Sequence, residues 1–383
     1  MELRFAGSPR PTLGVEWELA LVDRSARDLA NQAEDVFELL ESQHGIIAGT
    51  RVHREFLRNT VEIVTGICDT TAQAMGEISD TLAALLDVGD QLGLDFLSAG
   101  THPFAQWTDH MLTDKPHYRE IINRSQYWGR QMLIWGVHVH VGVSHPDKVF
   151  PILNALLMKY PHLLALSGSS PMWDGQDTGY ASTRALLFQQ LPTAGLPFQF
   201  ETWQQFEQFT ADQVTTGIIE SVGGLHWDIR PNPALGTIEI RVCDGTPTLR
   251  ELAGLVALMH CLVVDLDERF TRGEQLPSMP PWLVQENKWR AARYGLDAEI
   301  ITDDACTERL VTDEITSMLE QLAPVAQRLD CSAELASVAD ILRIGASYQR
   351  QRAAARAGGM TAVVDQLVAE LRGSIGAGAS GRT

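Results

Sequence analysis

The sequence contains few cysteines, and those present form no recognisable pattern. The chain of 383 residues has five, which lie far apart and include no CxxC pair: Cys68, Cys243, Cys261, Cys306 and Cys331. An odd and scattered set fits neither a disulfide framework nor a structural zinc site. We therefore expect free thiols, most of them buried, in a protein of a reducing compartment.

Positive charge is also scarce. Lys and Arg together number 30 against 49 Asp and Glu, which gives a formal net charge of -19 at pH 7. Binding to a nucleic-acid backbone needs a broad cationic surface, so we expect no nucleic-acid partner. Any phosphate group would have to be bound locally, by metal ions and a few arginines.

Long hydrophobic runs and an export signal are missing. The longest apolar stretch, 253–264, is interrupted by His260 and is shorter than the roughly 18 residues that span a bilayer. The first residues, MELRFAGSPRPTLG, show no basic start followed by an apolar core. We expect a cytoplasmic protein that does not bind a membrane.

Two familiar catalytic motifs are absent as well. The sequence has no GxxxxGK[ST] phosphate-binding loop and no GxSxG nucleophile elbow. None of the cysteines lies beside the His or Asn pattern of a thiol nucleophile, which disfavours covalent catalysis. A nucleotide would therefore be held by metal ions and by residues of a sheet.

The sequence does contain clear secondary-structure patterns. Period-two alternation predicts strands at 13–22, 60–65, 94–99, 134–143, 225–230 and 236–243. Helical periodicity predicts helices at 27–43, 71–92, 147–166, 204–220, 249–271, 313–329 and 333–371, with capping-box patterns at Thr70/Gln73 and Thr248/Glu251. Because helices and strands do not alternate regularly, we expect an α+β fold with an antiparallel or mixed sheet and helices on one side. We expect a single domain over 1–372 and a flexible tail over 373–383.

Three of the predicted strands carry ionisable side chains on one face and apolar side chains on the other. In TLGVEWELALV, Glu16 and Glu18 share a face because successive side chains of a strand point to opposite sides. The same alternation recurs in WGVHVHVGV and GTIEIRVCD, where the polar pairs are His138 with His140 and Glu239 with Arg241. The sheet would therefore present E-x-E, H-x-H and E-x-R on one polar face.

A fourth segment, REFLRNTVEIVTG, adds Glu55 and Glu62, the latter on a short strand. Carboxylates with one or two imidazoles suit Mg²⁺ or Mn²⁺, whereas a structural zinc site favours thiolates or more histidines. An antiparallel sheet often has one solvated face, so the charges on any single strand need indicate only solubility. The combination of Glu, His and Arg beside large apolar side chains favours a metal site.

In this order, GVEWE, NTVEIVTG, WGVHVHVGV and GTIEIRVCDGTP resemble the motifs of the glutamate-cysteine ligase type 2 family, the bacterial carboxylate-amine ligases. The resemblance extends over about 11–359 and includes AGTHPFAQW, YASTRALLFQQLP, NKWRAARYGLDA and GASYQRQR. It implies a glutamine-synthetase-like α+β fold covered by helices. In that fold an antiparallel sheet forms a funnel that holds two or three divalent metal ions between ATP and glutamate.

The resemblance also implies a role for each polar residue. Glu18, Glu55 and Glu62 would hold the metal ion nearer the amino acid. Glu16, His138 and Glu239 would hold those on the ATP phosphates, and Arg241 would act beside Glu239 by contacting the phosphoryl group in transfer. Three further residues are implied to bind substrate. Arg184 would bind a substrate carboxylate, and Arg230 would bind phosphate or glutamate. His140 would either support the metal ligands or face the substrate.

The implied reaction joins glutamate to cysteine at the expense of ATP, through γ-glutamyl phosphate, with Mg²⁺ or Mn²⁺. The acceptor amine stays open, because relatives of the family use amines other than cysteine. A metal-dependent amide hydrolase is an alternative, since H-x-H on a strand also opens the binuclear site of barrel amidohydrolases, but that fold needs eight βα units. A noncatalytic ligand-binding relative is a third interpretation. We expect small-molecule substrates, and the sequence leaves open whether the protein forms a homodimer.

Overall fold

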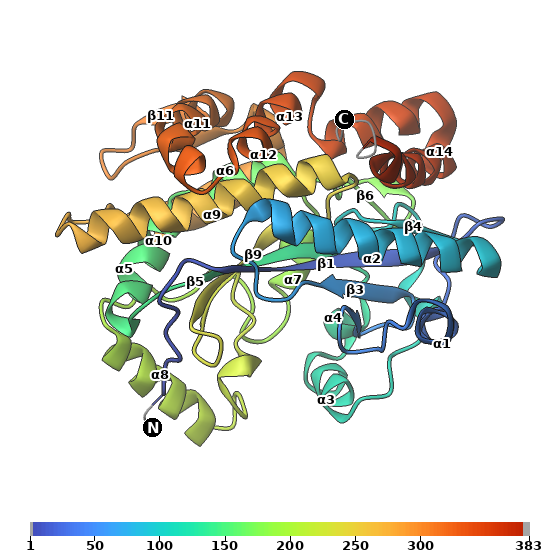
Figure 1. The fold of residues 1–383 in the computed structure, drawn as a ribbon, viewed down its shortest axis with the longest axis horizontal. Coiled ribbons are helices and arrows are strands. Elements are labelled where there is room, and N and C mark those ends of the chain that lie inside the picture. Colours follow the sequence, from blue (N-terminus) through green and yellow to red (C-terminus); the bar gives the residue numbers. More distant parts are fainter. Residues whose placement is uncertain (1–2, 378–383) are drawn as a thin grey trace.

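The computed structural model describes residues 3–377, apart from the side chain of His117. A seven-stranded sheet forms its centre, with the order β2-β3-β1-β5-β9-β8 and with β4 paired to β1 (Figure 1). Every pairing in it is antiparallel. The strands are β1 (Leu13–Asp23), β2 (Val52–Arg54), β3 (Thr60–Val64), β4 (Leu94–Leu97), β5 (Gly136–Gly142), β8 (Ile229–Asn232) and β9 (Thr237–Asp244).

One face of this sheet is apolar and is covered by two long helices, α2 (Thr71–Leu92) and α9 (Leu249–Thr271) (Figure 1). The side chain of Trp17 is completely buried on this face, among the valines of β5 and the isoleucines of β9. Thr70 and Thr248 cap the two helices, since each hydroxyl accepts a hydrogen bond from the backbone N–H three residues ahead. Both helix ranges and both threonine caps agree with the prediction, but the reciprocal half of each capping box does not, because Gln73 accepts from the N–H of Asp69 and Glu251 pairs with Arg350.

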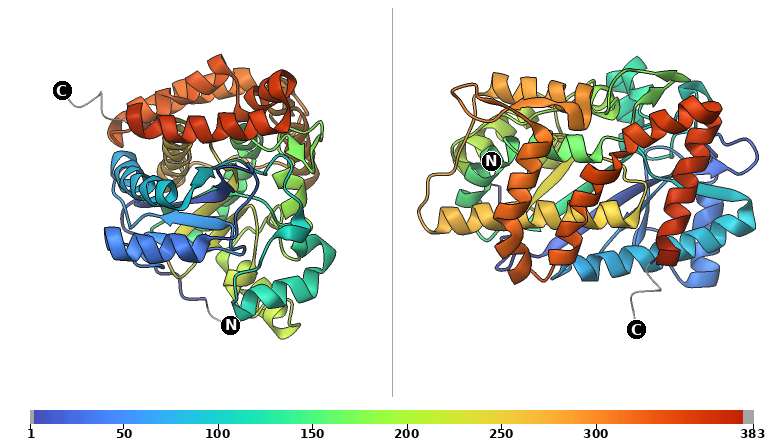
Figure 2. Two further views of the ribbon diagram at one scale, coloured as in Figure 1. Left: turned by 90° about the vertical axis from the view of Figure 1, so that its right-hand side faces the viewer. Right: turned by 90° about the horizontal axis from the view of Figure 1, so that it is seen from above.

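Helix α9 is buried on nearly all sides because a further layer of helices lies over it (Figure 2). This layer contains α11 (Val311–Arg328), α12 (Ser332–Ala336), α13 (Val338–Ile344) and α14 (Ser347–Ala377). The predicted helix at 333–371 is therefore three helices. The chain breaks at Gly345 (φ 91°) and kinks at Gly359 (φ 76°), two left-handed positions that glycine adopts without strain.

The remaining elements lie around the edges of the sheet and on its other side. Helices α3, α4 and α8 lie on the side opposite α2 and α9 (Figure 1), so helices flank both faces and not one. The other helices are α1 (Ala33–His44), α3 (Pro116–Ser125), α4 (Tyr127–Arg130), α5 (Pro146–Leu157), α6 (Tyr160–Ser167), α7 (Arg184–Phe188), α8 (Trp203–Thr215) and α10 (Pro281–Tyr294). Two small strand pairs are β6 (Met172–Trp173) with β7 (Gln176–Asp177) and β10 (Glu299–Ile301) with β11 (Glu308–Leu310).

Several predicted boundaries differ from the structure. The helix expected at 147–166 divides into α5 and α6, and Pro161, which has no N–H to donate, lies in the first turn of α6. Of the expected tail, residues 373–377 belong to α14, and 378–383 lie outside the described residues. The eight βα units of an amidohydrolase barrel are not found in residues 3–377, whose central sheet is antiparallel.

The described cysteines form no disulfide, and four of the five are buried, with Cys306 the exposed one. No single helix within 3–377 has the length and apolar character to cross a membrane. Helices α5 and α6 pass that test only as a pair, which is bent by 59°.

Candidate active site

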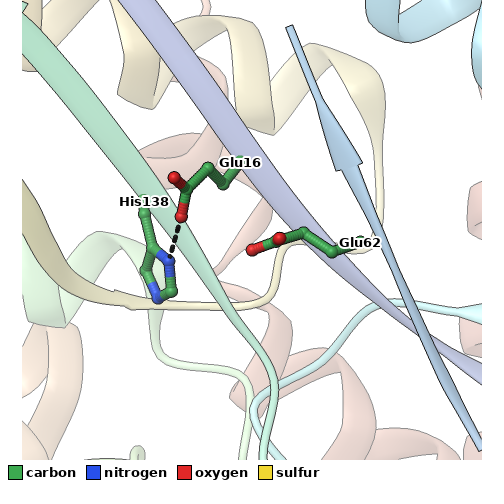
Figure 3. Close-up of side chains that lie close together, drawn as sticks. All are labelled: Glu16, Glu62 and His138. Atoms are coloured by element: carbon green, nitrogen blue, oxygen red, sulfur yellow. Dashed lines mark hydrogen bonds and ion pairs between the residues drawn. The ribbon is translucent and has the colours of Figure 1, made fainter. Parts of the chain in front are cut away.

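Strand register brings the E-x-E and H-x-H motifs together on the polar face of the sheet. Glu16 of β1 lies opposite His138 of β5, and the Glu16 carboxylate is 2.9 Å from Nδ1 of His138 and 3.2 Å from Nε2 of His140. Figure 3 shows the carboxyl group of Glu62, on β3, pointing toward this pair. Side chains from three adjacent strands therefore converge on one point.

The E-x-R motif continues this arrangement on the next two strands. His140 lies opposite Glu239 of β9, and Glu239 lies opposite Arg230 of β8. The Glu239 carboxylate accepts hydrogen bonds from Arg241 (2.5 Å) and from Nε (2.8 Å) and Nη2 (3.1 Å) of Arg230. A β-bulge opposite His138 interrupts the β5–β9 register next to Arg241, and such bulges redirect side chains beside active sites.

At the other end of the polar face three carboxyl groups gather. Glu18 lies opposite Glu62 in the β1–β3 register, and Glu55 comes from the turn between β2 and β3. The backbone N–H of Gly136 donates to the Glu18 carboxylate, which fixes the position of Glu18 at the start of β5. This end of the face therefore carries three acids close together.

Three groups of these residues have the geometry to hold a cation. In each group one ligand atom per residue lies within 4.8 Å of the others: Glu16, Glu62 and His138; Glu16, His140 and Glu239; Glu18, Glu55 and Glu62. Carboxylate oxygens with one imidazole are a donor set that suits Mg²⁺ and Mn²⁺. The third group matches the set implied for the metal ion nearer the amino acid. The set implied for the ATP phosphates, Glu16 with His138 and Glu239, is not one of the three, because His138 groups with Glu16 and Glu62 while His140 lies beside Glu16 and Glu239.

The two ends of the face differ electrostatically. Burial raises the pKa of Glu18 to about 8, and the neighbouring Glu55 adds to this rise. Burial and then Glu55 likewise raise the pKa of Glu62 well above its ordinary range. Burial opposes ionisation of Glu239 too, but Arg241 and Arg230 outweigh it and lower its pKa. One end thus holds three acids whose charge Arg184 offsets only in part, and the other end is neutralised by Arg241 and Arg230.

Burial and neighbouring charges also set the protonation of His138 and Arg241. Burial lowers the pKa of His138 to about 4, and the nearby Arg241 adds to this effect. A neutral imidazole keeps a lone pair for a metal ion. Burial opposes the charge on Arg241, but Glu239 and Glu16 outweigh it and raise its pKa. Arg241 therefore remains a fixed cation beside the candidate ligands.

Arg184 is the first residue of α7, and only 4% of its surface is exposed. Its guanidinium is 3.4 Å from the carbonyl oxygen of Arg241 and lies against Gly136, next to Glu18. Arg54, a further arginine near these strands, pairs instead with Glu34. The structure thus brings together all ten residues that the sequence singles out as site candidates.

Some residues near the site were not anticipated. Lys115 Nζ donates to the carbonyl of Arg54 and lies over the ring of Tyr118. Burial raises the pKa of Tyr118, as do the charges of Glu55 and Glu62. Both residues belong to the segment entering α3, which shows no strong period in the sequence. The Pro at the start of α3 was the one available signal.

A cavity of about 450 Å³ adjoins the Glu16–His140 end of the polar face. Its walls include the exposed apolar residues Ile67 and Leu235, together with Thr237 and residues 7–10. The cavity and the three-acid cluster therefore lie toward opposite ends of the row of candidate ligands.

Comparison with known proteins identifies the family. The model of Glutamate-cysteine ligase family 2 (GCS2) matches residues 12–369. The chain belongs to glutamate-cysteine ligase family 2. Two relatives are "Putative glutamate--cysteine ligase 2-2" of Rhodococcus jostii, 62% identical over 97% of this chain and 100% of its own length, and "Putative glutamate--cysteine ligase 2-1" of Mycolicibacterium smegmatis, 60% identical over 96% of each.

Solved structures of other proteins resemble this chain in fold. The glutamate-cysteine ligase of Francisella tularensis, determined in complex with AMP, superposes with a TM-score of 0.68 at 16% identity, over 98% of this chain and 95% of that one. A bifunctional glutathione synthetase of Pasteurella multocida gives 0.66 at 13% identity, over 96% of this chain and 53% of that one. The expected α+β class with a central antiparallel sheet is thereby confirmed.

Proposed function

We propose that the protein is an ATP-dependent carbon-nitrogen ligase that couples glutamate to cysteine and forms γ-glutamylcysteine. The observation that carries the proposal is the convergence of four ionisable side chains beside Arg241 on one sheet face, namely Glu16, His138, His140 and Glu239. Membership in glutamate-cysteine ligase family 2 supports the same reaction.

The reaction needs an activated carboxylate, because a free carboxylate would have to expel oxide. Transfer of the γ-phosphoryl group of ATP to the glutamate side chain gives an acyl phosphate, whose phosphate then leaves when the amine attacks. Mg²⁺ or Mn²⁺ held by the three groups of ligands would neutralise negative charge on the phosphates. Arg241, held as a cation by Glu239, would stabilise the charge that develops during transfer.

The two ends of the polar face suit the two substrates. An apolar cavity beside Glu16 and His140 fits the base and sugar of a nucleotide whose phosphates point toward Arg241. The opposite end, with Glu18 and the buried Arg184, fits the amino acid. This orientation places the γ-phosphate between the two, where in-line transfer requires it.

The acceptor is tested by measuring ADP release with ATP, Mg²⁺ and glutamate across a panel of amines that includes cysteine. We expect the highest kcat/KM with cysteine and no ADP release without a divalent cation. A higher value for another amine would keep the ligase chemistry and change the product. Product formation that survives complete chelation, or amide hydrolysis without ATP, would refute the proposal. We also propose a cytoplasmic location, because the odd and scattered cysteines of the sequence fit a reducing compartment.

A further inference from the structure

Asp244, the last residue of β9, is completely buried three residues beyond Arg241. Its Oδ2 accepts hydrogen bonds from the backbone N–H of Ser169 (3.0 Å) and the hydroxyl of Ser170 (2.6 Å). Its Oδ1 accepts one from the hydroxyl of Ser182 (2.8 Å). Both carboxyl oxygens are therefore committed to the segment that leads into α7.

The two serines in turn hold the backbone of α7. The Ser170 hydroxyl oxygen accepts the N–H of Arg184 (3.1 Å), and that of Ser182 accepts the N–H of Ala185 (3.2 Å). The Asp244 carboxyl group is thus linked through single hydroxyl groups to the first two backbone amides of the helix. Hydroxyl groups can donate and accept at once, so each serine serves both ends of this chain.

The guanidinium of Arg184 lies close to the same carboxyl group, with Nη1 4.0 Å from Oδ1 of Asp244. Its other contacts are long, 3.4 to 3.5 Å to the carbonyl oxygens of Arg241 and Val242, and its buried Nε has no partner. Five N–H donors in a buried guanidinium normally find acceptors. Arg184 therefore retains unused donor capacity at a site where a substrate carboxylate is expected.

Gly136, which lies opposite Asp244 in the β5–β9 register, also adjoins this arginine. A Cβ atom at position 136 would lie 2.3 Å from Nη2 of Arg184, far inside van der Waals contact. The N–H of Gly136 also donates to Glu18. The guanidinium therefore lies against the paired ends of β5 and β9, where there is no room for a side chain at position 136.

We propose that Asp244 is a positioning residue that holds Arg184 in its place for binding the carboxylate of the acid substrate. The inference rests on the proposed function, since it names what Arg184 binds in that reaction. Asp244 acts through the Ser170 and Ser182 hydroxyls on the backbone and through its own carboxyl group on the guanidinium. It touches no substrate itself.

The test is a double-mutant cycle with Asp244→Asn and Arg184→Gln. Asparagine keeps the shape but has one acceptor oxygen in place of two, so it cannot serve both ends of the network. We expect Asp244→Asn to raise the KM for the acid substrate about tenfold, as for a weakened charge-assisted hydrogen bond, while the KM for ATP changes little. In the Arg184→Gln background the same substitution should change neither constant further.

Gly136→Ala provides a second variant, which disturbs Arg184 by direct contact and changes no side chain of the Asp244 network. It should also raise the KM for the acid substrate, and this rise should vanish in the Arg184→Gln background. Asp340→Asn is the matched control, because Asp340 pairs with Arg250 and Arg343 on the surface. It should leave all constants unchanged.

The possible outcomes distinguish a failure of the proposed ligase function from a failure of the positioning role of Asp244. A wild-type protein without ligase activity for any acid would refute the proposed function itself. An active wild type whose KM for the acid is unchanged by both Asp244→Asn and Gly136→Ala would overturn the positioning role alone. Effects of the two variants that persist undiminished without Arg184 would also overturn it, because they would not act through that side chain.

Discussion

Glu18 and Glu62 lie directly opposite each other on antiparallel strands β1 and β3, so two acids occupy a cross-strand position where like charges repel. Burial raises the pKa of Glu18 to about 8 and that of Glu62 well above its ordinary range. Such a pair costs stability when it is ionised. This cost is expected at a place that is built for a cation and not for the fold.

Glu18 should make the metal-free protein less stable as the pH rises from about 4.5 to about 8. Glu18 keeps its proton in the folded state over this range and loses it in the unfolded chain, so the folded state binds more protons and rising pH favours unfolding. Buried His138, whose pKa is lowered, acts in the opposite direction, so the effect is measured as the difference in Tm between the wild type and Glu18→Gln, in chelator, at pH 5.5 and pH 8. The wild type should lose Tm relative to this variant at pH 8, and Mg²⁺ should restore it there with little effect at pH 5.5. A difference that is the same at both pH values would contradict the assignment.

Glu62→Gln should abolish most turnover without harming the fold. The amide keeps the size of the side chain but removes a charged ligand shared by two of the three groups, and we expect a fall in kcat of about 100-fold or more. The metal-free Tm at pH 8 should stay equal or rise, because repulsion with Glu18 is relieved. Glu38→Gln, on the exposed face of α1, is the control. Unfolding of the Glu62 variant with unchanged metal affinity would instead indicate a structural role.

Arg241→Lys should lower kcat strongly and leave the KM for ATP nearly unchanged. Lysine keeps the positive charge but loses the planar fork that contacts two oxygens at once. For a contact made in the transition state we expect a cost of about 2 to 4 kcal/mol, or roughly a 30- to 1000-fold fall in rate. A normal kcat with a raised KM for ATP would show that Arg241 binds the ground state.

Arg184→Lys should chiefly raise the KM for the acid substrate, because a carboxylate clamp acts equally in the ground and transition states. The kcat should change less than it does in Arg241→Lys, and the KM for ATP should stay close to its normal value. Comparing both constants in the two lysine variants separates the roles. A strong fall in kcat at unchanged KM would assign Arg184 to the transferring phosphoryl group.

Ile67→Asp should raise the KM for ATP and leave the KM for the acid unchanged. Ile67 contributes to the apolar wall of the cavity beside Glu16, and 81% of its surface is exposed, so the substitution costs the core little. Ile344→Asp, at a half-exposed position on α13, is the control. If the acid constant changed instead, the two substrates would have to be placed at the opposite ends.

The site was largely predictable because its residues follow strand alternation. Once Val15 and Trp17 are assigned to the core, Glu16 and Glu18 must share the other face, and the same argument holds for β5 and β9. Strand order could not be obtained in this way. The pairings of Glu16 with His138 and of His140 with Glu239 depend on which strands are neighbours, and alternation within one strand carries no such information.

The parts that sequence reasoning missed depend on contacts between distant segments. Asp244 reads as the polar end of a strand, and its partners Ser169, Ser170 and Ser182 lie more than sixty residues away in sequence. The single long helix predicted at 333–371 was wrong. The chain turns at Ser337 and again at Gly345, and these turns let the separate helices pack over α9. Periodicity alone continues through such breaks.

The strict alternation of ligands and core residues along β1 also restricts how this gene can change. Deleting or inserting one residue between Leu13 and Leu19 would exchange the two faces of β1. The carboxylates would then point into the hydrophobic core, and Trp17 would point toward the candidate site. Length changes should therefore destroy the site when they fall within the central strands, but should be tolerated in the loops at the strand ends. New acceptor preferences should arise in descendants through those loops, while the spacing of E-x-E, H-x-H and E-x-R stays fixed.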